Sequence, residues 1–171
     1  MRKAAFILLL GVLALLIPGT VLRTVFPQLV APNLLAVLLV WVAFHEVSAL
    51  GALLAFLLGL ELDFCSGTLL GPWAGAYAAV FGLLVLSSKR IFIESPSVVF
   101  IAVFAAVLLS SGIYHVMLVL IYGAARLEVF GALTTALLEA GASAILAPIL
   151  FHFVPRRSPP ENGLYRHTLR G

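Results

Sequence analysis

The chain has 171 residues, of which 63% are hydrophobic and 10% are charged, with a formal net charge of +3. Soluble domains are about 45–50% apolar, so this composition and a mean hydropathy of +1.20 exclude a soluble domain and indicate a polytopic membrane protein. The basic residues stand at the ends of apolar runs and are not interleaved with aromatic residues on one face, which argues against nucleic-acid binding.

Six apolar runs without Asp, Glu, Lys or Arg follow one another, and only Glu139 interrupts the last. The runs cover residues 4–22, 24–45, 47–60, 64–88, 95–125 and 129–155. A helix needs about 20 residues to cross a hydrocarbon core of about 30 Å, and only the third run falls short of that length. We predict an all-α bundle of six transmembrane helices in one domain, residues 1–154, followed by a polar cytoplasmic tail, residues 155–171.

The distribution of positive charge predicts the orientation of these six spans. With the N-terminus inside, only Arg23 and Arg126 lie outside. The cytoplasmic set is Arg2, Lys3, Lys89, Arg90, Arg156, Arg157, Arg166 and Arg170. Cytoplasmic loops of membrane proteins carry an excess of Lys and Arg. We therefore predict that both termini are cytoplasmic. The second span is expected to open at Pro32 and Asn33, with the proline in the first helical turn.

Small residues spaced four apart mark faces where membrane helices pack closely. Two neighbouring runs carry such stripes, which are Gly51, Ala55 and Gly59 in the third run and Gly71, Gly75 and Ala79 in the fourth. The stripes are expected to face each other within the bundle or to face the helix of a partner. The spacing alone leaves both interpretations open.

Two acids follow the third run. Because that run rises only about 21 Å at 1.5 Å per residue, we expect its helix to continue through Glu61 and Asp63. One further step of four from Gly59 places Asp63 on the small-residue face. Glu61 is turned about 200° away, toward lipid headgroups or another crevice. Asp63 is either a functional buried acid or a cap for the start of the next helix.

Two further polar residues lie inside predicted spans. His115 shares a helix face with Ser111, and Glu139 is flanked at four-residue steps by Thr135 and Ser143. We expect Asp63, His115 and Glu139 to line one polar cavity that opens outward. The alternative for His115 is a core histidine bonded to a serine or a carbonyl. A carboxyl group within a span needs a proton or a partner. Glu139 is therefore either protonated without a further role, or it has a functional role or an essential contact.

The sequence carries no catalytic or cofactor signature. It lacks a phosphate-binding glycine loop, a His-Glu-x-x-His zinc motif and a nucleophile elbow. Its single cysteine, Cys65, excludes an internal disulfide and a cysteine-based zinc site. We therefore predict no catalytic residues, no cofactor and no metal site. An intramembrane enzyme would have to depend on Glu139.

The stretch from Gly59 to Tyr77 resembles the signature of the MreD family of bacterial rod shape-determining membrane proteins. The residues that carry this resemblance are Gly59, Leu60, Glu61, Leu62, Asp63, Gly67, Leu70, Gly71, Ala74 and Tyr77, together with Pro32 and Asn33. The resemblance implies a non-enzymatic, multi-pass protein of the bacterial cytoplasmic (inner) membrane that acts in the elongation complex. It also implies association with the bitopic protein MreC and, directly or through MreC, with the MreB filament and the RodA and penicillin-binding protein pair of peptidoglycan synthesis.

Two functions follow from the resemblance. The first is a scaffold that holds the transmembrane helix of an MreC-like partner, with the contact face formed by Gly51, Ala55, Gly59, Asp63, Gly67, Gly71, Gly75 and Tyr77. The second follows because the family is similar in architecture to the S-components of energy-coupling-factor transporters, six-helix proteins with an outward-opening pocket. In that case Asp63, His115 and Glu139 would line the binding pocket of a small-molecule transport subunit.

Overall fold

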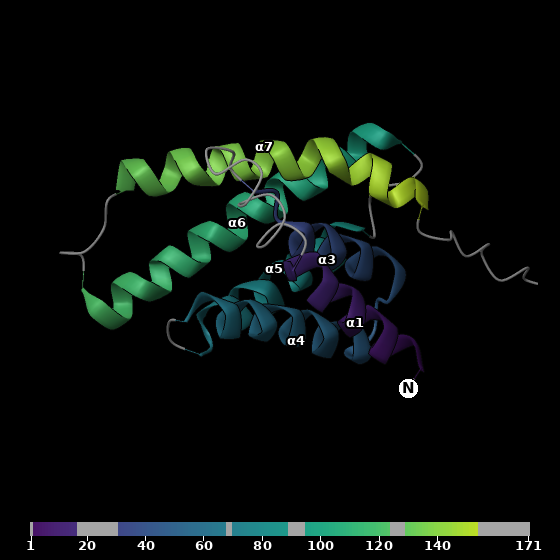
Figure 1. Ribbon diagram of the computed structural model, residues 1–171, viewed down its shortest axis with the longest axis horizontal. Coiled ribbons are helices and arrows are strands. Elements are labelled where there is room, and N and C mark those ends of the chain that lie inside the picture. The colour runs from purple at the N-terminus through teal and green to yellow at the C-terminus, as the bar shows by residue number, and fades with distance from the viewer. Residues whose placement is uncertain (1, 17–30, 68–69, 89–94, 124–128, 154–171) are drawn as a thin grey trace, which may run out of the picture.

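The computed structural model describes residues 2–16, 31–67, 70–88, 95–123 and 129–153, and these residues fold into six helices (Figure 1). The helices are α1 (Arg2–Leu16), α3 (Leu34–His45), α4 (Ala49–Ser66), α5 (Pro72–Ser88), α6 (Pro96–Tyr122) and α7 (Val129–Phe153). The predicted all-α class is therefore confirmed for the described residues.

Three of the described helices are long and apolar enough to cross a membrane: α4, α6 and the part of α7 from Gly131 to Phe151. The other three, α1, α3 and α5, are apolar but shorter. Six complete spans and two cytoplasmic termini therefore stay predictions. The basic residues from Arg23 onward and the tail over residues 155–171, on which the predicted orientation depends, lie outside the described residues.

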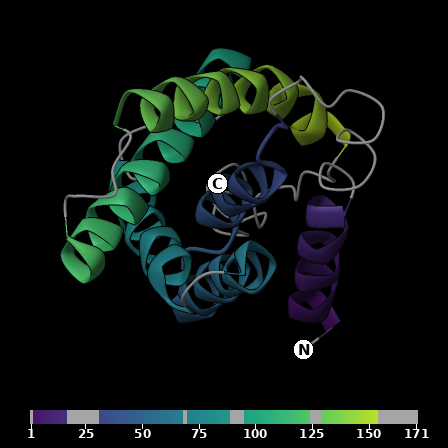
Figure 2. The same ribbon diagram turned by 60° about the vertical axis from the view of Figure 1, so that its left-hand side comes forward.

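Helix α3 occupies the centre of the bundle although it has only 12 residues. It packs against each of the other five described helices, which form an open ring around it (Figure 2). Its buried residues are Leu35, Ala36, Val37, Leu39, Val40, Val42 and Ala43, which cover most of its circumference and leave one side, with Leu34, Leu38 and Trp41, less buried. A helix that is hydrophobic all round belongs in a core. The part of this run that the structure describes, from residue 31 onward, contains a core helix of 12 residues.

Asn33 starts α3 by capping it. Its side-chain oxygen accepts a hydrogen bond from the Ala36 N–H at 2.9 Å, which satisfies one of the free N–H groups of the first turn. Pro32 had been expected in the first turn, but it lies one residue before this cap. The start of the helix at Pro32 and Asn33 was predicted correctly to within two residues.

Helix α4 continues through Glu61 and Asp63 to Ser66, as predicted from the length of its apolar run. Gly67 follows with a φ of 64°, a left-handed conformation that suits glycine and ends the helix. Gly67 therefore acts as a helix terminator and not, as had been predicted, as a helix-packing residue.

The small-residue stripe of α4 packs inside the molecule. Gly51, Ala55 and Gly59 are all buried. A Cβ added at Gly59 would lie 2.5 Å from the Trp73 carbonyl oxygen and 2.6 Å from the Ala74 Cα, so glycine permits a close approach of α4 to α5. Of the two interpretations of this stripe, contact within the bundle is the one that the structure supports.

The second predicted stripe does not face α4. Gly71 lies before α5 with a φ of 122°, because Pro72 is the first residue of that helix. Gly75 faces α6, where an added Cβ would lie 3.0 Å from the Met117 Cε, and Ala79 is exposed. The prediction of this stripe required Gly71 to belong to the helix. Because α5 begins only at Pro72, Gly71 lies outside it and the stripe does not form.

Candidate functional site

Asp63 joins the end of α4 to the beginning of α5. Its Oδ2 accepts hydrogen bonds from the Gly71 N–H at 2.9 Å and the Ala74 N–H at 3.1 Å, and its Oδ1 accepts one from the Trp73 N–H at 3.0 Å. The side chain is 1% exposed. Of the two roles expected for Asp63, the structure places it as the cap of the next helix.

Pro72 explains why one carboxylate can satisfy this helix start. The first N–H groups of a helix have no partner within it, but proline has no N–H to satisfy. The remaining N–H groups from position 71 to position 74 all point to Asp63. The negative carboxylate also lies at the positive end of the helix dipole. Pro72 and Asp63 therefore act together to satisfy this helix start, although they are nine positions apart in the sequence.

Glu61 turns away from Asp63, as helical phase predicts, and it packs against α1 and not among headgroups. A Cβ added at Gly11, within α1, would overlap the Glu61 Oε2. This oxygen is buried and has no hydrogen-bond partner in the described part of the chain. The predicted orientation toward lipid headgroups is wrong, and the alternative, a separate crevice, is correct.

A second polar cluster joins α3, α5 and α7. The Asn33 N–H donates to Ser143 Oγ at 2.7 Å, and the Tyr77 hydroxyl donates to Asn33 Oδ1 at 3.1 Å. The Ser143 hydroxyl donates to the Glu139 carbonyl at 2.6 Å, and the Glu139 side chain lies beside the Asn33 side chain. Asn33 is thus the hub of contacts among three helices. We call these four residues the Asn33 cluster.

Aromatic rings connect the Asp63 cap to the Asn33 cluster and to α6. Trp73 meets Tyr77 edge-on, with ring centroids 6.2 Å apart, and stacks on Tyr114 of α6 at 4.1 Å. Tyr114 in turn meets the His115 ring edge-on at 5.5 Å. The Tyr77 side chain is fully buried. The Asp63 cap and the Asn33 cluster are therefore neighbours, connected through Trp73 and Tyr77.

His115 occupies a different setting. Its Nδ1 lies 2.7 Å from the Ser111 carbonyl oxygen. A carbonyl only accepts, so Nδ1 carries the proton of this bond. The ring lines a cavity of about 270 Å³ between α6 and α7, whose other lining residues are Leu108, Ser111, Gly112, Ala132, Leu133, Ala136 and Leu137. This bond to a carbonyl matches the alternative expectation for His115.

The three residues predicted to share one cavity lie in three separate settings. Neither Asp63 nor Glu139 lines the His115 cavity. Asp63 is occupied by the start of α5, and Glu139 faces Asn33 of α3. Among the described residues, no group of three or more His, Cys, Asp or Glu side chains could hold a metal ion.

Asn33 is the functional residue that sequence reasoning undervalued. It was interpreted only as a helix start, because its contacts with Tyr77 and Ser143 span 44 and 110 residues. One signal was available. Asn33, Tyr77, Glu139 and Ser143 are polar groups in strongly apolar runs, where each such group needs a partner. Nothing in the spacing says which partner each will find.

An all-helical fold with long apolar helices, held together inside by hydrogen-bonded polar side chains, defines a helical membrane protein. The model of one protein family, rod shape-determining protein MreD, matches residues 2–157. The chain belongs to the MreD family, and its membership implies involvement in rod-shape determination. No curated protein and no solved structure matches it.

Proposed function

We propose that the chain is a non-enzymatic membrane scaffold of cell-shape determination and lateral peptidoglycan synthesis. In this role it holds the transmembrane helix of an MreC-like bitopic partner within the bacterial cytoplasmic membrane. The observation that carries the proposal is the family match over residues 2–157. Through this partner, or directly, the scaffold would reach the MreB filament and the RodA and penicillin-binding protein complex.

The use of the intramembrane acids supports a scaffold over a chemical role. Both carboxylate oxygens of Asp63 accept hydrogen bonds from backbone N–H groups, and Glu139 faces the side chain of Asn33. A catalytic acid or base has to reach the reacting group of a substrate. These two acids instead connect helices, which is what a rigid platform for another helix requires.

The partner face differs from the one that the glycine spacing suggested, because Gly51, Ala55 and Gly59 are buried under α5. The groove between α6 and α7 is the better candidate. Small residues line it, including Gly112 and Ala132. Small residues allow a neighbouring membrane helix to approach closely, and the cavity at His115 would accept a large side chain from such a helix.

Gly112→Leu tests this assignment with little risk to the fold, because no described atom lies within 4 Å of a Cβ added there. The matched control is Gly82→Leu on α5, where an added Cβ likewise meets no described atom within 4 Å. The assay is co-purification of a co-expressed MreC-like protein from detergent-solubilised membranes. We expect Gly112→Leu to abolish co-purification and Gly82→Leu to preserve it, and equal recovery with both variants would refute this face.

The alternative function, a small-molecule subunit of the S-component kind, has less support. Its pocket was expected to join Asp63, His115 and Glu139, and the cavity at His115 includes only one of them. Native mass spectrometry separates the two functions, since a transport subunit would retain a stoichiometric polar metabolite. Such a metabolite, lost in a His115→Ala variant, would favour the alternative over the scaffold.

A further inference from the structure

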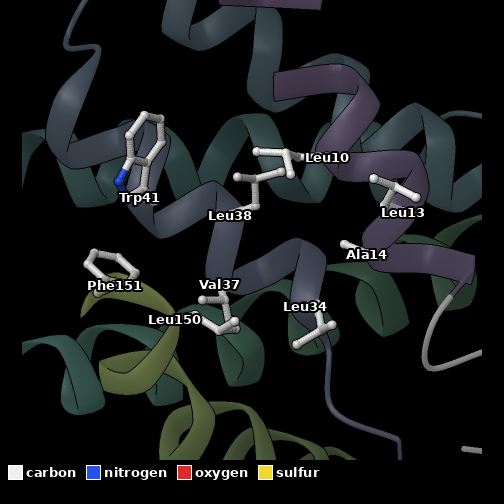
Figure 3. A pocket seen from close by; sticks show the side chains of 9 residues that line it. All are labelled: Leu10, Leu13, Ala14, Leu34, Val37, Leu38, Trp41, Leu150 and Phe151. Atoms are coloured by element: carbon white, nitrogen blue, oxygen red, sulfur yellow. The ribbon is translucent and has the colours of Figure 1, made fainter. Parts of the chain in front are cut away.

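Two cavities of similar size in the described part of the chain differ in their linings. The cavity between α1, α3 and α7, of about 240 Å³, is lined by nine apolar or aromatic side chains (Figure 3). The cavity between α6 and α7, of about 270 Å³, is largely apolar but includes the His115 ring. In such sites a few well-placed polar groups provide the specificity. The chemistry of the His115 cavity therefore identifies what binds there, and that of the other cavity does not.

The His115 ring is held in one orientation from two sides. Its Nδ1–H donates to the Ser111 carbonyl oxygen at 2.7 Å, and the ring meets Tyr114 edge-on with centroids 5.5 Å apart. Tyr114 is itself stacked on Trp73 of α5. A group that is ordered before binding loses less freedom when it binds. His115 is thus a pre-organised group for recognition.

The second ring nitrogen of His115, Nε2, is an acceptor without a donor in the described part of the chain. The lining residues include no carboxylate to balance a positive charge, and charged groups are costly in a membrane, so the ring is neutral. In a neutral imidazole one nitrogen donates and the other accepts. The bond from Nδ1 is the one that the ring makes to described residues. Unlike the Glu61 Oε2, Nε2 is not enclosed by them, so a bound molecule can reach it.

The position of His115 along α6 makes a free acceptor costly. The helix continues for seven more residues to Tyr122, a distance of about 10 Å. Leu120 in this segment is 79% exposed, as expected for a helix that faces lipid. Lipid tails supply no hydrogen-bond donor, so a polar group at this depth needs a partner from protein. A helix that brings a donor to Nε2 therefore binds more tightly than one that brings only apolar surface.

We propose that His115 selects the partner helix by accepting a hydrogen bond at Nε2 from a neutral donor on that helix. The donor is the hydroxyl of a serine, threonine or tyrosine, or the indole N–H of a tryptophan. This inference rests on the proposed function, which places the helix between α6 and α7. A lysine or arginine would bring a charge that no acid in the lining balances. Gly112, three residues before His115 on the same side of α6, is exposed and lets the partner's backbone approach.

Two amide substitutions separate the roles of the two ring nitrogens. The amide nitrogen of asparagine lies about as far from the backbone as Nδ1, and the amide oxygen of glutamine about as far as Nε2. His115→Asn therefore keeps the bond to the Ser111 carbonyl and loses the acceptor, whereas His115→Gln keeps an acceptor and loses that bond. We expect His115→Asn to weaken association with the partner and His115→Gln to retain it. Any other order of the two variants overturns the proposal.

Association is measured in nanodiscs by Förster transfer between a dye on Cys65, the single and exposed cysteine of the chain, and a labelled MreC-like protein. His115→Asn is expected to raise the dissociation constant roughly 3- to 15-fold, as for one hydrogen bond between membrane helices. His45→Asn is the matched control, because His45 Nδ1 makes the same kind of bond, to the Trp41 carbonyl oxygen at 2.9 Å, outside this cavity. It is expected to leave the dissociation constant unchanged.

Gly112→Leu separates a failure of this inference from a failure of the proposed function. If Gly112→Leu abolishes association and His115→Asn leaves it intact, the partner face stands and the role of Nε2 is refuted. If neither variant changes association, both are refuted. The donor is then identified by replacing the hydroxyl and tryptophan residues of the partner helix one at a time. The effect of one such replacement is expected to disappear in the His115→Asn background, and full additivity of all of them contradicts the proposal.

Discussion

Replacing Asp63 with asparagine is expected to weaken the contact between α4 and α5. The carboxylate offers two acceptor oxygens to three N–H groups, those of Gly71, Trp73 and Ala74. Asparagine is nearly the same size, but it has one oxygen and one NH₂ group. If the asparagine oxygen takes the position of Oδ2, the bonds from the Gly71 and Ala74 N–H groups remain. The NH₂ group then faces the Trp73 N–H, donor against donor, and that bond is lost.

The size of this effect follows from the bonds that are lost. A hydrogen bond to a charged group contributes about 1.5–3 kcal/mol, and a buried donor left without an acceptor costs about 1–3 kcal/mol. One bond is lost and the two others become neutral, so Asp63→Asn is expected to lower the free energy of unfolding by roughly 2–3 kcal/mol. Asp63→Ala removes all three acceptors and is expected to cost more.

The neighbouring acid provides the matched control. The Glu61 Oε2 has no hydrogen-bond partner in the described part of the chain, so Glu61→Gln removes no described bond and is expected to leave the stability unchanged or to raise it. The assay is reversible unfolding in mixed micelles with an increasing fraction of SDS, followed by tryptophan fluorescence. The reasoning fails if Asp63→Asn unfolds with the wild type, or if Glu61→Gln loses as much stability as Asp63→Asn.

Two further predictions use the same assay. Tyr77→Phe removes the hydroxyl bonded to Asn33 Oδ1 at 3.1 Å and is expected to cost about 1 kcal/mol; an unchanged midpoint would show that this bond adds nothing. Gly59→Ala brings a Cβ to 2.5 Å from the Trp73 carbonyl oxygen and is expected to cost about 1–3 kcal/mol through overpacking. Gly82→Ala, with open space at its Cβ, is the control and is expected to be neutral.

The sequence predicted those features of the fold that depend on local rules. Composition indicated helices in a membrane, and the short third run required α4 to continue through Asp63, which it does. Helical phase correctly placed Asp63 on the face of Gly59 and turned Glu61 away from it. The start of α3 was predicted to within two residues because proline is common at the beginning of helices. Each of these inferences needs information from no more than about two helical turns.

One feature was predicted incorrectly for a local reason, and the others depend on contacts between distant segments. The stripe that included Gly71 failed because Pro72 begins α5 and Gly71 belongs to the turn. The shared cavity failed because an acid in a membrane binds the nearest available donor. For Asp63 this donor is a helix start, whereas Glu139 lies beside Asn33, more than 100 residues away in the sequence. The rotation of each helix about its axis decides these pairings, and apolar runs do not encode it.

The polar contacts divide the bundle into a fixed part and a part that can respond to binding. Apolar helices gain little from mutual contact in lipid, so hydrogen bonds and close packing have to hold them in place. Asp63 connects α4 to α5, and Asn33 connects α3 to α5 and α7. The groove between α6 and α7 is lined by none of the side chains that make these hydrogen bonds. A partner helix can therefore act at this groove without breaking the hydrogen bonds of the core.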